Sequence, residues 1–147
     1  MLSDIFDPQR IKLDLKGTTK TGVLMELADV IAASDPRFDS RKLFEAITER
    51  ESKKSTIIMP GVAVPHGYCG DVQGIIGAMG YSRAGIEYDD LDKEPVHLIF
   101  LILMDESSRE KHLKTLTRLL ELLNSPGFRE IHKTGSPEEV FKLLSRY

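Results

Sequence analysis

The chain of 147 residues contains one cysteine and carries a formal net charge of only -3. Because Cys69 has no possible partner within the chain, an internal disulfide is excluded. The small net charge gives no reason to expect a polyanionic partner, so nucleic acid is not predicted to bind. The longest apolar run, residues 96–104, is interrupted by His97 and is far shorter than the ~20 residues of a membrane-spanning helix. No direct membrane insertion is therefore expected.

Signals for export and for common cofactors are also lacking. Residues 1–17 mix Asp and Lys with apolar residues and have no continuous hydrophobic core, so we expect no export signal and a cytoplasmic location. Neither a Gly-x-x-x-x-Gly-Lys-Ser/Thr loop nor a Gly-x-Gly-x-x-Gly fingerprint occurs, which argues against a nucleotide cofactor. His66 and Cys69 have the spacing of half a zinc site but no matching second pair, so no metal is expected.

The alternation of predicted helices and strands fits one α/β domain over residues 1–147. Helical periodicity predicts a helix from Thr21 to a stop at residues 34–36, then a second helix, capped by Ser40, that delivers Arg50 to a loop. Two segments, 73–81 and 96–104, are predicted strands. The second of these is apolar on both faces, so we expect it to be a central strand covered on both sides.

A third helix is predicted to begin at Ser107 or Ser108 and to carry His112 near its start. Its apolar stripe is predicted to consist of Leu113, Leu116, Leu119, Leu120 and Leu123. On this spacing His112 points toward the edge of the core. Residues 136–139 begin a final helix, which is expected to dock through Val140, Phe141, Leu143 and Leu144.

The segment 59–67 carries the clearest functional signal, because it ends in Pro65, His66 and Gly67. Proline fixes φ and glycine permits an unusual backbone turn, so together they can hold the imidazole rigidly at the end of a short strand. A histidine that acts as a nucleophile or as an acid–base group needs such fixed presentation. A turn histidine without chemistry remains the alternative for this motif alone.

Further polar residues suggest a phosphate site around this histidine. The segment that follows Arg50 contains Lys54, Ser55 and Thr56, whose charge and hydroxyl groups suit a phosphate. His112 lies near a predicted helix N-terminus, where the helix dipole favours an anion or a neutral imidazole. A solvated loop and a half-buried surface histidine are the respective alternatives.

Several motifs occur in the order seen in one known family. The patterns Arg-Glu, Ser-Thr and Gly-x-Ala-x-Pro-His-Gly are matched at residues 50–51, 55–56 and 61–67. Downstream, Gly-Ile-x-aromatic-Asp, Pro-Val-x-Leu-Ile-Phe and His-Leu-x-x-Leu are matched at residues 85–89, 95–100 and 112–116. The chain thus resembles the enzyme IIA components of the bacterial sugar phosphotransferase system, of the fructose and mannitol type, which includes the nitrogen-regulatory branch.

The resemblance implies a specific chemistry. His66 would accept a phosphoryl group from the histidine phosphocarrier protein HPr and pass it to a cysteine on a IIB partner. Arg50 and His112 would be its companions in the pocket, with Thr56 as an additional hydrogen-bond donor. Phosphoryl transfer depends on positioning and charge neutralisation, which a guanidinium and a second imidazole supply. The family's fold, a mixed β-sheet flanked by helices, fits the predicted alternation, and no cofactor is implied.

One loop departs from the family pattern. Glycines are usual where this chain has Lys54, Ile57 and Met59, and an asparagine is usual where it has Pro60. Fewer glycines imply a stiffer loop with fewer backbone amides free to bind a phosphate. We hypothesise that Lys54 partly compensates as a mobile cation.

Three functions are compatible with these observations. The first is a phosphocarrier in sugar uptake that uses His66. The second is a regulatory protein of the nitrogen-regulatory kind, in which the phosphorylation state of His66 controls protein targets. The third is a small hydrolase with His66 and His112 as base and acid, for which no positioned carboxylate is visible in the sequence.

Overall fold

The computed structural model describes residues 1–53, 55–88, 94–128, 130, 133 and 135–147. Within these ranges the elements come in groups, with helices before and after a run of strands. In chain order they are β1 (Ile11–Lys12), α1 (Lys20–Ser34), α2 (Ser40–Glu51), β2 (Ile57–Met59), β3 (Val62–Ala63), β4 (His66–Tyr68), β5 (Ile75–Ile86), β6 (Val96–Met104), α3 (Arg109–Leu123) and α5 (Pro137–Leu144). Short 3-10 helices lie at Leu2–Asp4, Pro8–Arg10 and Glu106–Ser108.

The strands form one mixed sheet in the order β1-β5-β6-β3-β2. Strand β6 is antiparallel to β5 and parallel to β3. Strand β4 continues beyond β3 and is also parallel to β6. The strand predicted at 96–104 is therefore present with those bounds and is central, whereas β5 extends past its predicted end.

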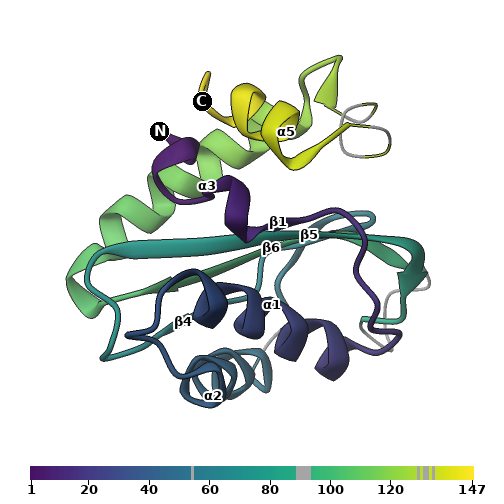
Figure 1. The fold of residues 1–147 in the computed structure, drawn as a ribbon. Helices are drawn as coiled ribbons and strands as arrows, with labels where there is room; N and C mark the ends of the chain where they lie inside the picture. Colours follow the sequence, from purple (N-terminus) through teal and green to yellow (C-terminus); the bar gives the residue numbers. More distant parts are fainter. Residues whose placement is uncertain (54, 89–93, 129, 131–132, 134) are drawn as a thin grey trace.

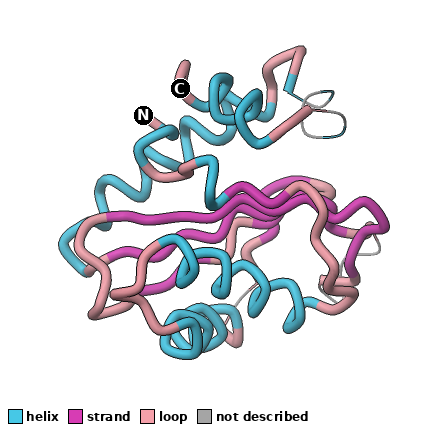
Figure 2. The backbone as a smooth tube through the Cα atoms, viewed as in Figure 1, coloured by secondary structure: helices cyan, strands magenta, loops and turns pink. Residues whose placement is uncertain are grey.

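Helices cover both faces of this sheet (Figure 1). Helices α1 and α2 lie on one face, and α3, α5 and the N-terminal segment lie on the other. The tube view shows the same three layers (Figure 2). The two termini lie close together, where the Leu2 amide donates a hydrogen bond to the Tyr147 carbonyl at 2.7 Å. The predicted fold class, a mixed sheet flanked by helices, is confirmed.

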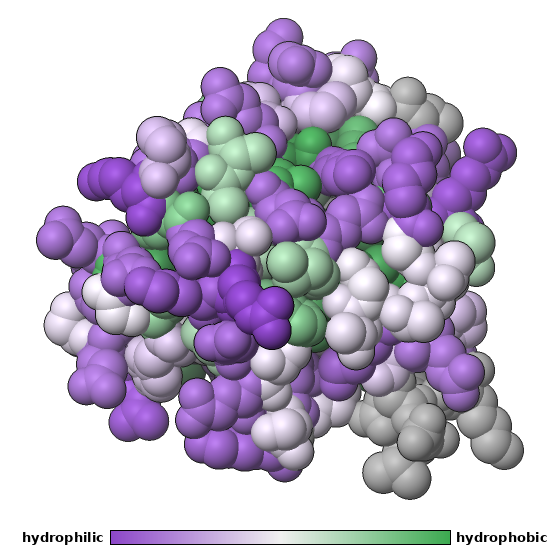
Figure 3. Space-filling model, turned by 60° about the horizontal axis from the view of Figure 1, so that its bottom comes forward, coloured by the Kyte–Doolittle hydropathy of each residue, from purple (hydrophilic) through white to green (hydrophobic). Residues whose placement is uncertain are grey.

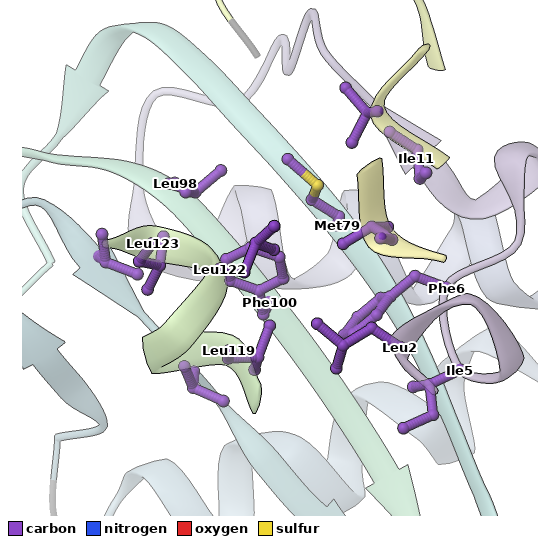
Figure 4. Packing of buried hydrophobic residues seen from close by; sticks show 14 of the residues in the cluster. Leu2, Ile5, Phe6, Ile11, Met79, Leu98, Phe100, Leu119, Leu122 and Leu123 are labelled. Carbon is purple, nitrogen blue, oxygen red and sulfur yellow. The ribbon is translucent and has the colours of Figure 1, made fainter. Parts of the chain in front are cut away.

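Strand β6 separates two hydrophobic clusters. Its even-numbered residues from Leu98 to Met104 belong to the cluster under α3 and α5, which Figure 4 shows around Phe100. Its odd-numbered residues from Ile99 to Leu103 belong to the cluster under α1 and α2. Successive side chains of a strand point to opposite faces, so one apolar run supplies both clusters.

Helix α3 packs differently from the prediction. Leu119, Leu122 and Leu123 are buried, but the side chains of Leu113 and Leu120 are 61% and 41% exposed. The predicted stripe was therefore wrong at these two leucines. The residues buried in their place on α3 include His112 and Thr115, two polar residues that a hydrophobic pattern does not reveal.

The cap of α2 also differs from the prediction. The Asp39 side chain accepts a hydrogen bond from the Arg41 amide and precedes the first helical residue, Ser40. The prediction of Ser40 as the cap was therefore wrong by one residue. The predicted end of this helix near Arg50 is confirmed, because α2 ends at Glu51.

Large apolar side chains are mostly confined to the interior. The face shown in Figure 3 is largely hydrophilic, with separate small hydrophobic areas.

Within the described ranges, no helix combines the length and the apolar character that crossing a membrane requires.

The segment Val62–Tyr68 follows one edge of β6 as two short strands with a break between them. At the break, Pro65 has no amide to donate, and its carbonyl accepts a hydrogen bond from the Ile102 amide at 2.9 Å. His66 then begins β4 opposite Ile102. The prediction that it lies at the end of a short strand was therefore wrong. Pairing on both sides of the break holds the His66 backbone against the central strand.

Gly67 is needed for close packing and not for a turn. It does not have a positive φ, so the predicted reason for a glycine at this position was wrong. A Cβ atom at this position would lie 2.6 Å from the carbonyl oxygen of Ala46 in α2. The backbone of α2 thus approaches β4 directly, which brings the C-terminal end of α2 toward His66.

We expect Gly67→Ala to lower the free energy of unfolding by about 1–3 kcal/mol, because the added methyl group meets backbone atoms that cannot rotate away. Urea denaturation would measure the change. Gly70→Ala is the matched control, since a Cβ atom there would meet nothing within 4 Å. Equal stability of the two variants would contradict the proposed reason for Gly67.

Candidate functional site

Two histidine rings from different elements of the fold lie side by side. His66 is the first residue of β4, and His112 is the fourth residue of α3. Their ring centroids are 4.5 Å apart, with the ring planes tilted by 38°. The His66 ring is half-buried, and His112 is only 7% exposed. The structure thus brings together the two histidines that the sequence singles out.

The position of His112 depends on the junction between β6 and α3. The Asp105 carboxylate accepts hydrogen bonds from the Gly74 amide at 2.7 Å and from the hydroxyls of Ser107 and Ser108. The Gly74 bond, followed by those from the two serines, lowers the pKa of Asp105 to about 2. Sequence reasoning missed Asp105, although an Asp between a strand and a Ser-Ser pair is a usual helix-start signal.

One hydrogen bond determines which nitrogen of His66 can react. Nδ1 of His66 lies 3.0 Å from the carbonyl oxygen of Val64. A carbonyl oxygen only accepts, so in this geometry Nδ1 carries the proton and donates it. In the neutral ring, Nε2 then has the free lone pair. The turn through Pro65 therefore presents His66 with Nε2 as the nucleophilic nitrogen.

Both imidazoles are neutral near pH 7. Burial lowers the pKa of His66, and Arg50 lowers it further, against the opposing effects of the Val64 hydrogen bond and the Glu51 carboxylate. Burial, followed by the positive charge that His66 gains when it is protonated in acid and by the charge of Arg50, lowers the pKa of His112 to about 4. A neutral ring keeps the lone pair that a nucleophile needs.

The positive charge of Arg50 affects the pKa values of both histidine rings. Arg50 is half-buried in the last turn of α2, and its charge acts on His66 and on His112. The close contact between Gly67 and the α2 backbone explains this placement. A guanidinium whose charge acts on two neutral imidazoles is an arrangement suited to a dianionic phosphoryl group.

The other predicted phosphate-binding residues have different surroundings. The Thr56 hydroxyl is buried and donates its hydrogen bond to the Glu51 carboxylate. This donor is therefore not available to a phosphate. The Ser55 hydroxyl is buried and, among the described residues, has no hydrogen-bond partner. Nδ1 of His112 shares that property. Lys54 lies outside the described residues.

Glu51 is a buried carboxylate that sequence reasoning did not assign a role. It bonds to Thr56 and Tyr88 and forms an ion pair with Lys20. These partners lie far apart in the sequence, so only its place in the Arg-Glu motif could have drawn attention to it.

The remaining polar candidates lie in other settings. Nδ1 of His97 is 2.8 Å from the Ser82 carbonyl, and Cys69 is a buried free thiol. In the part of the chain that the structure describes, no three His, Cys, Asp or Glu side chains gather as a metal site.

The chain is similar to known proteins over nearly its full length. A family model described as "Phosphoenolpyruvate-dependent sugar phosphotransferase system, EIIA 2" matches residues 4–147. A nitrogen regulatory protein of Pseudomonas aeruginosa is 33% identical, over 97% of this chain and 94% of that protein. A fructose-specific EIIABC component of Bacillus subtilis is 30% identical, over 99% of this chain and 23% of that protein. The crystal structure of the nitrogen regulatory protein IIA-Ntr from Neisseria meningitidis has a TM-score of 0.85 and 30% identity, and the match covers 97% of this chain and 98% of that one.

The lowered pKa of His112 predicts a loss of stability in acid. The unfolded chain binds a proton at this residue below about pH 6.5, whereas the folded protein resists protonation until about pH 4. The contribution of His112 to the free energy of unfolding therefore has its full value above about pH 6.5. This contribution falls between about pH 6.5 and pH 4 and does not change further below about pH 4. The difference in unfolding free energy between the wild type and His112→Gln should shift in favour of the variant across this window. A pH-independent difference in urea melts would contradict this assignment.

Proposed function

Because the chain belongs to the EIIA 2 family of the phosphoenolpyruvate-dependent sugar phosphotransferase system, we propose that it carries a phosphoryl group on Nε2 of His66. The observation that supports this best is the hydrogen bond from Nδ1 of His66 to the Val64 carbonyl. It leaves Nε2 as the only ring nitrogen with a lone pair, in a ring that is neutral and lies against His112. A fixed, neutral imidazole is the form that can attack phosphorus.

The donor in this proposal is the phosphohistidine of HPr. As Nε2 of His66 approaches in line, a P–N bond forms on His66 while the P–N bond to the donor imidazole breaks and leaves its electron pair on the donor nitrogen. Negative charge is spread over three phosphoryl oxygens in such a transition state. The Arg50 guanidinium and the N–H of neutral His112 are suited to stabilise that charge.

For the acceptor, we propose a cysteine thiolate on a IIB partner, which places the chain in fructose- or mannitol-type sugar uptake in the cytoplasm. The relative from Bacillus subtilis, whose name includes the fructose-specific A, B and C components, supports this choice. In this second transfer the thiolate attacks phosphorus, and a P–S bond forms as the P–Nε2 bond of His66 breaks and leaves its electron pair on Nε2.

A regulatory role is the second candidate. The nitrogen regulatory proteins of Pseudomonas aeruginosa and Neisseria meningitidis are matched over 94% and 98% of their length, whereas the fructose-specific EIIABC component of Bacillus subtilis is matched over 23% of its length. In that role, phosphorylation would add nearly two negative charges beside Arg50 and His112 and thereby change which protein targets bind.

The hydrolase alternative has less support. A histidine that acts as a general base usually has its second nitrogen oriented by a carboxylate. Here Nδ1 of His66 bonds to a backbone carbonyl, and Glu51 bonds to Thr56 and Tyr88. We therefore do not assign hydrolysis to this pair of histidines.

The proposed carrier function predicts a label on one residue. Incubation with phosphoenolpyruvate, enzyme I and HPr should give acid-labile phosphate on the wild type and none on His66→Ala. NMR of the 15N-labelled product should place the phosphorus on Nε2. His97→Gln is the control, because His97 bonds to Ser82 and not to the histidine pair. Label that persists in His66→Ala would disprove the assignment, and label on Nδ1 would disprove the choice of nitrogen.

Onward transfer separates the two roles. If the chain serves sugar uptake, the phosphorylated protein should lose its label to the cysteine of a fructose- or mannitol-type IIB protein within seconds to minutes. Retention of label with every such IIB protein, together with a protein target that binds only one of the two phosphorylation states, would favour regulation. A IIB protein with its cysteine replaced by serine is the control for each assay.

A further inference from the structure

Glu51, the last residue of α2, is a buried carboxylate outside the proposed transfer chemistry. It is 7% exposed. Burial of a charged group is unfavourable unless the group is paired and hydrogen-bonded. Its Oε1 accepts hydrogen bonds from the Thr56 hydroxyl and from the Tyr88 hydroxyl, the latter at 2.9 Å, and Oε2 lies 3.0 Å from Nζ of Lys20. The carboxylate is thus held from three directions.

The groups around Glu51 come from separate parts of the chain. Lys20 begins α1, Thr56 precedes β2, and Tyr88 follows β5. A parallel bridge between Thr19 and Glu87 brings the first and last of these together, and Nζ of Lys20 lies 4.3 Å from the centre of the Tyr88 ring. Burial and the Glu51 charge raise the pKa of Tyr88, so its hydroxyl keeps the proton that it donates. The cluster therefore fixes one point at which three segments meet.

A short hydrogen-bonded route leads from this cluster to the His66 ring. The backbone carbonyl of Thr56 accepts a hydrogen bond from the Val64 amide at 2.9 Å. The carbonyl of Val64 in turn accepts from Nδ1 of His66 at 3.0 Å. The two bonds share Val64, whose amide bonds to Thr56 and whose carbonyl bonds to His66. The Glu51 carboxylate connects to this route through its hydrogen bond with the Thr56 hydroxyl.

We propose that Glu51 is a positioning residue for His66: held by Lys20 and Tyr88, it fixes Thr56, and through Val64 it keeps the His66 ring with the proton on Nδ1 and the lone pair on Nε2. Glu51 bonds to neither imidazole, so it acts through the backbone route. The proposal rests on the carrier function only for the use of Nε2. The orientation and the tautomer of the ring are properties of the unphosphorylated protein.

The tautomer of His66 tests this proposal without any transfer reaction. Long-range 1H–15N spectra of unphosphorylated protein with 15N-labelled histidine distinguish Nδ1–H from Nε2–H rings. We expect the Nδ1–H form to predominate in the wild type. Thr56→Val keeps the shape of the side chain but removes its hydroxyl, and Tyr88→Phe removes the second donor to Glu51. Either change should lower the ratio of Nδ1–H to Nε2–H by about threefold to tenfold, the usual effect of weakening one hydrogen bond.

Thr48→Val is the matched control. The Thr48 hydroxyl donates to the Phe44 carbonyl within α2 and takes no part in the route. This variant should have the tautomer ratio of the wild type. Glu51→Gln is a further variant that keeps an acceptor oxygen but loses the ion pair with Lys20. Backbone 1H–15N spectra would show that each variant is folded before its tautomer is read.

Transfer kinetics give the second readout. If Glu51 positions the ring, Thr56→Val should lower the maximal rate of phosphorylation by phosphorylated HPr about threefold to tenfold while the HPr concentration for half-maximal rate stays unchanged. A wild-type tautomer ratio in folded Thr56→Val and Tyr88→Phe would overturn the proposal, whatever happens to the rate. A shifted ratio in a protein that HPr never phosphorylates would support the positioning role and refute the carrier function.

Discussion

Burial of β6 on both faces is the constraint on which the other parts of the structure depend. The strand supplies alternate side chains to two hydrophobic clusters, so a shift of one residue would exchange both sets at once. It also pairs with β5 on one side and with β3 and β4 on the other. His66 is opposite Ile102 in this register, and α3, which carries His112, begins shortly after β6 ends. The two histidines meet because both are attached to the same rigid strand.

The pocket around His66 and His112 favours the neutral form of both imidazole rings. Burial keeps His66 and His112 neutral, and the positive charge of Arg50 acts in the same direction. The same burial leaves Nδ1 of His112 without a hydrogen-bond partner among the described residues. A cation together with a buried polar atom that lacks a partner among the described residues favours an incoming anion. These electrostatic properties agree with the phosphoryl group that we propose as the ligand of this site.

Local patterns predicted the elements better than they predicted contacts. The uninterrupted apolar run made β6 identifiable, and a motif with proline and glycine around it drew attention to His66. The exposure of Leu113 was missed because polar residues occupy the buried side of α3, contrary to any count of hydrophobic positions. The role of Gly67 was misread because close approach of two backbones leaves no local signal. The partners of Glu51 were not predictable, since they come from segments joined only in the folded chain.

The contact between α2 and β4 has a consequence for how the pocket meets a partner. Backbone packs against backbone at Gly67, with no intervening side chain whose rotamers could change the spacing. The spacing between the end of α2, which carries Arg50, and β4, which carries His66, is therefore determined by main-chain geometry. Most of the entropy lost in assembling the site is lost when the chain folds. An encounter with another protein then requires little further ordering on this side of the interface, which favours fast exchange between short-lived complexes.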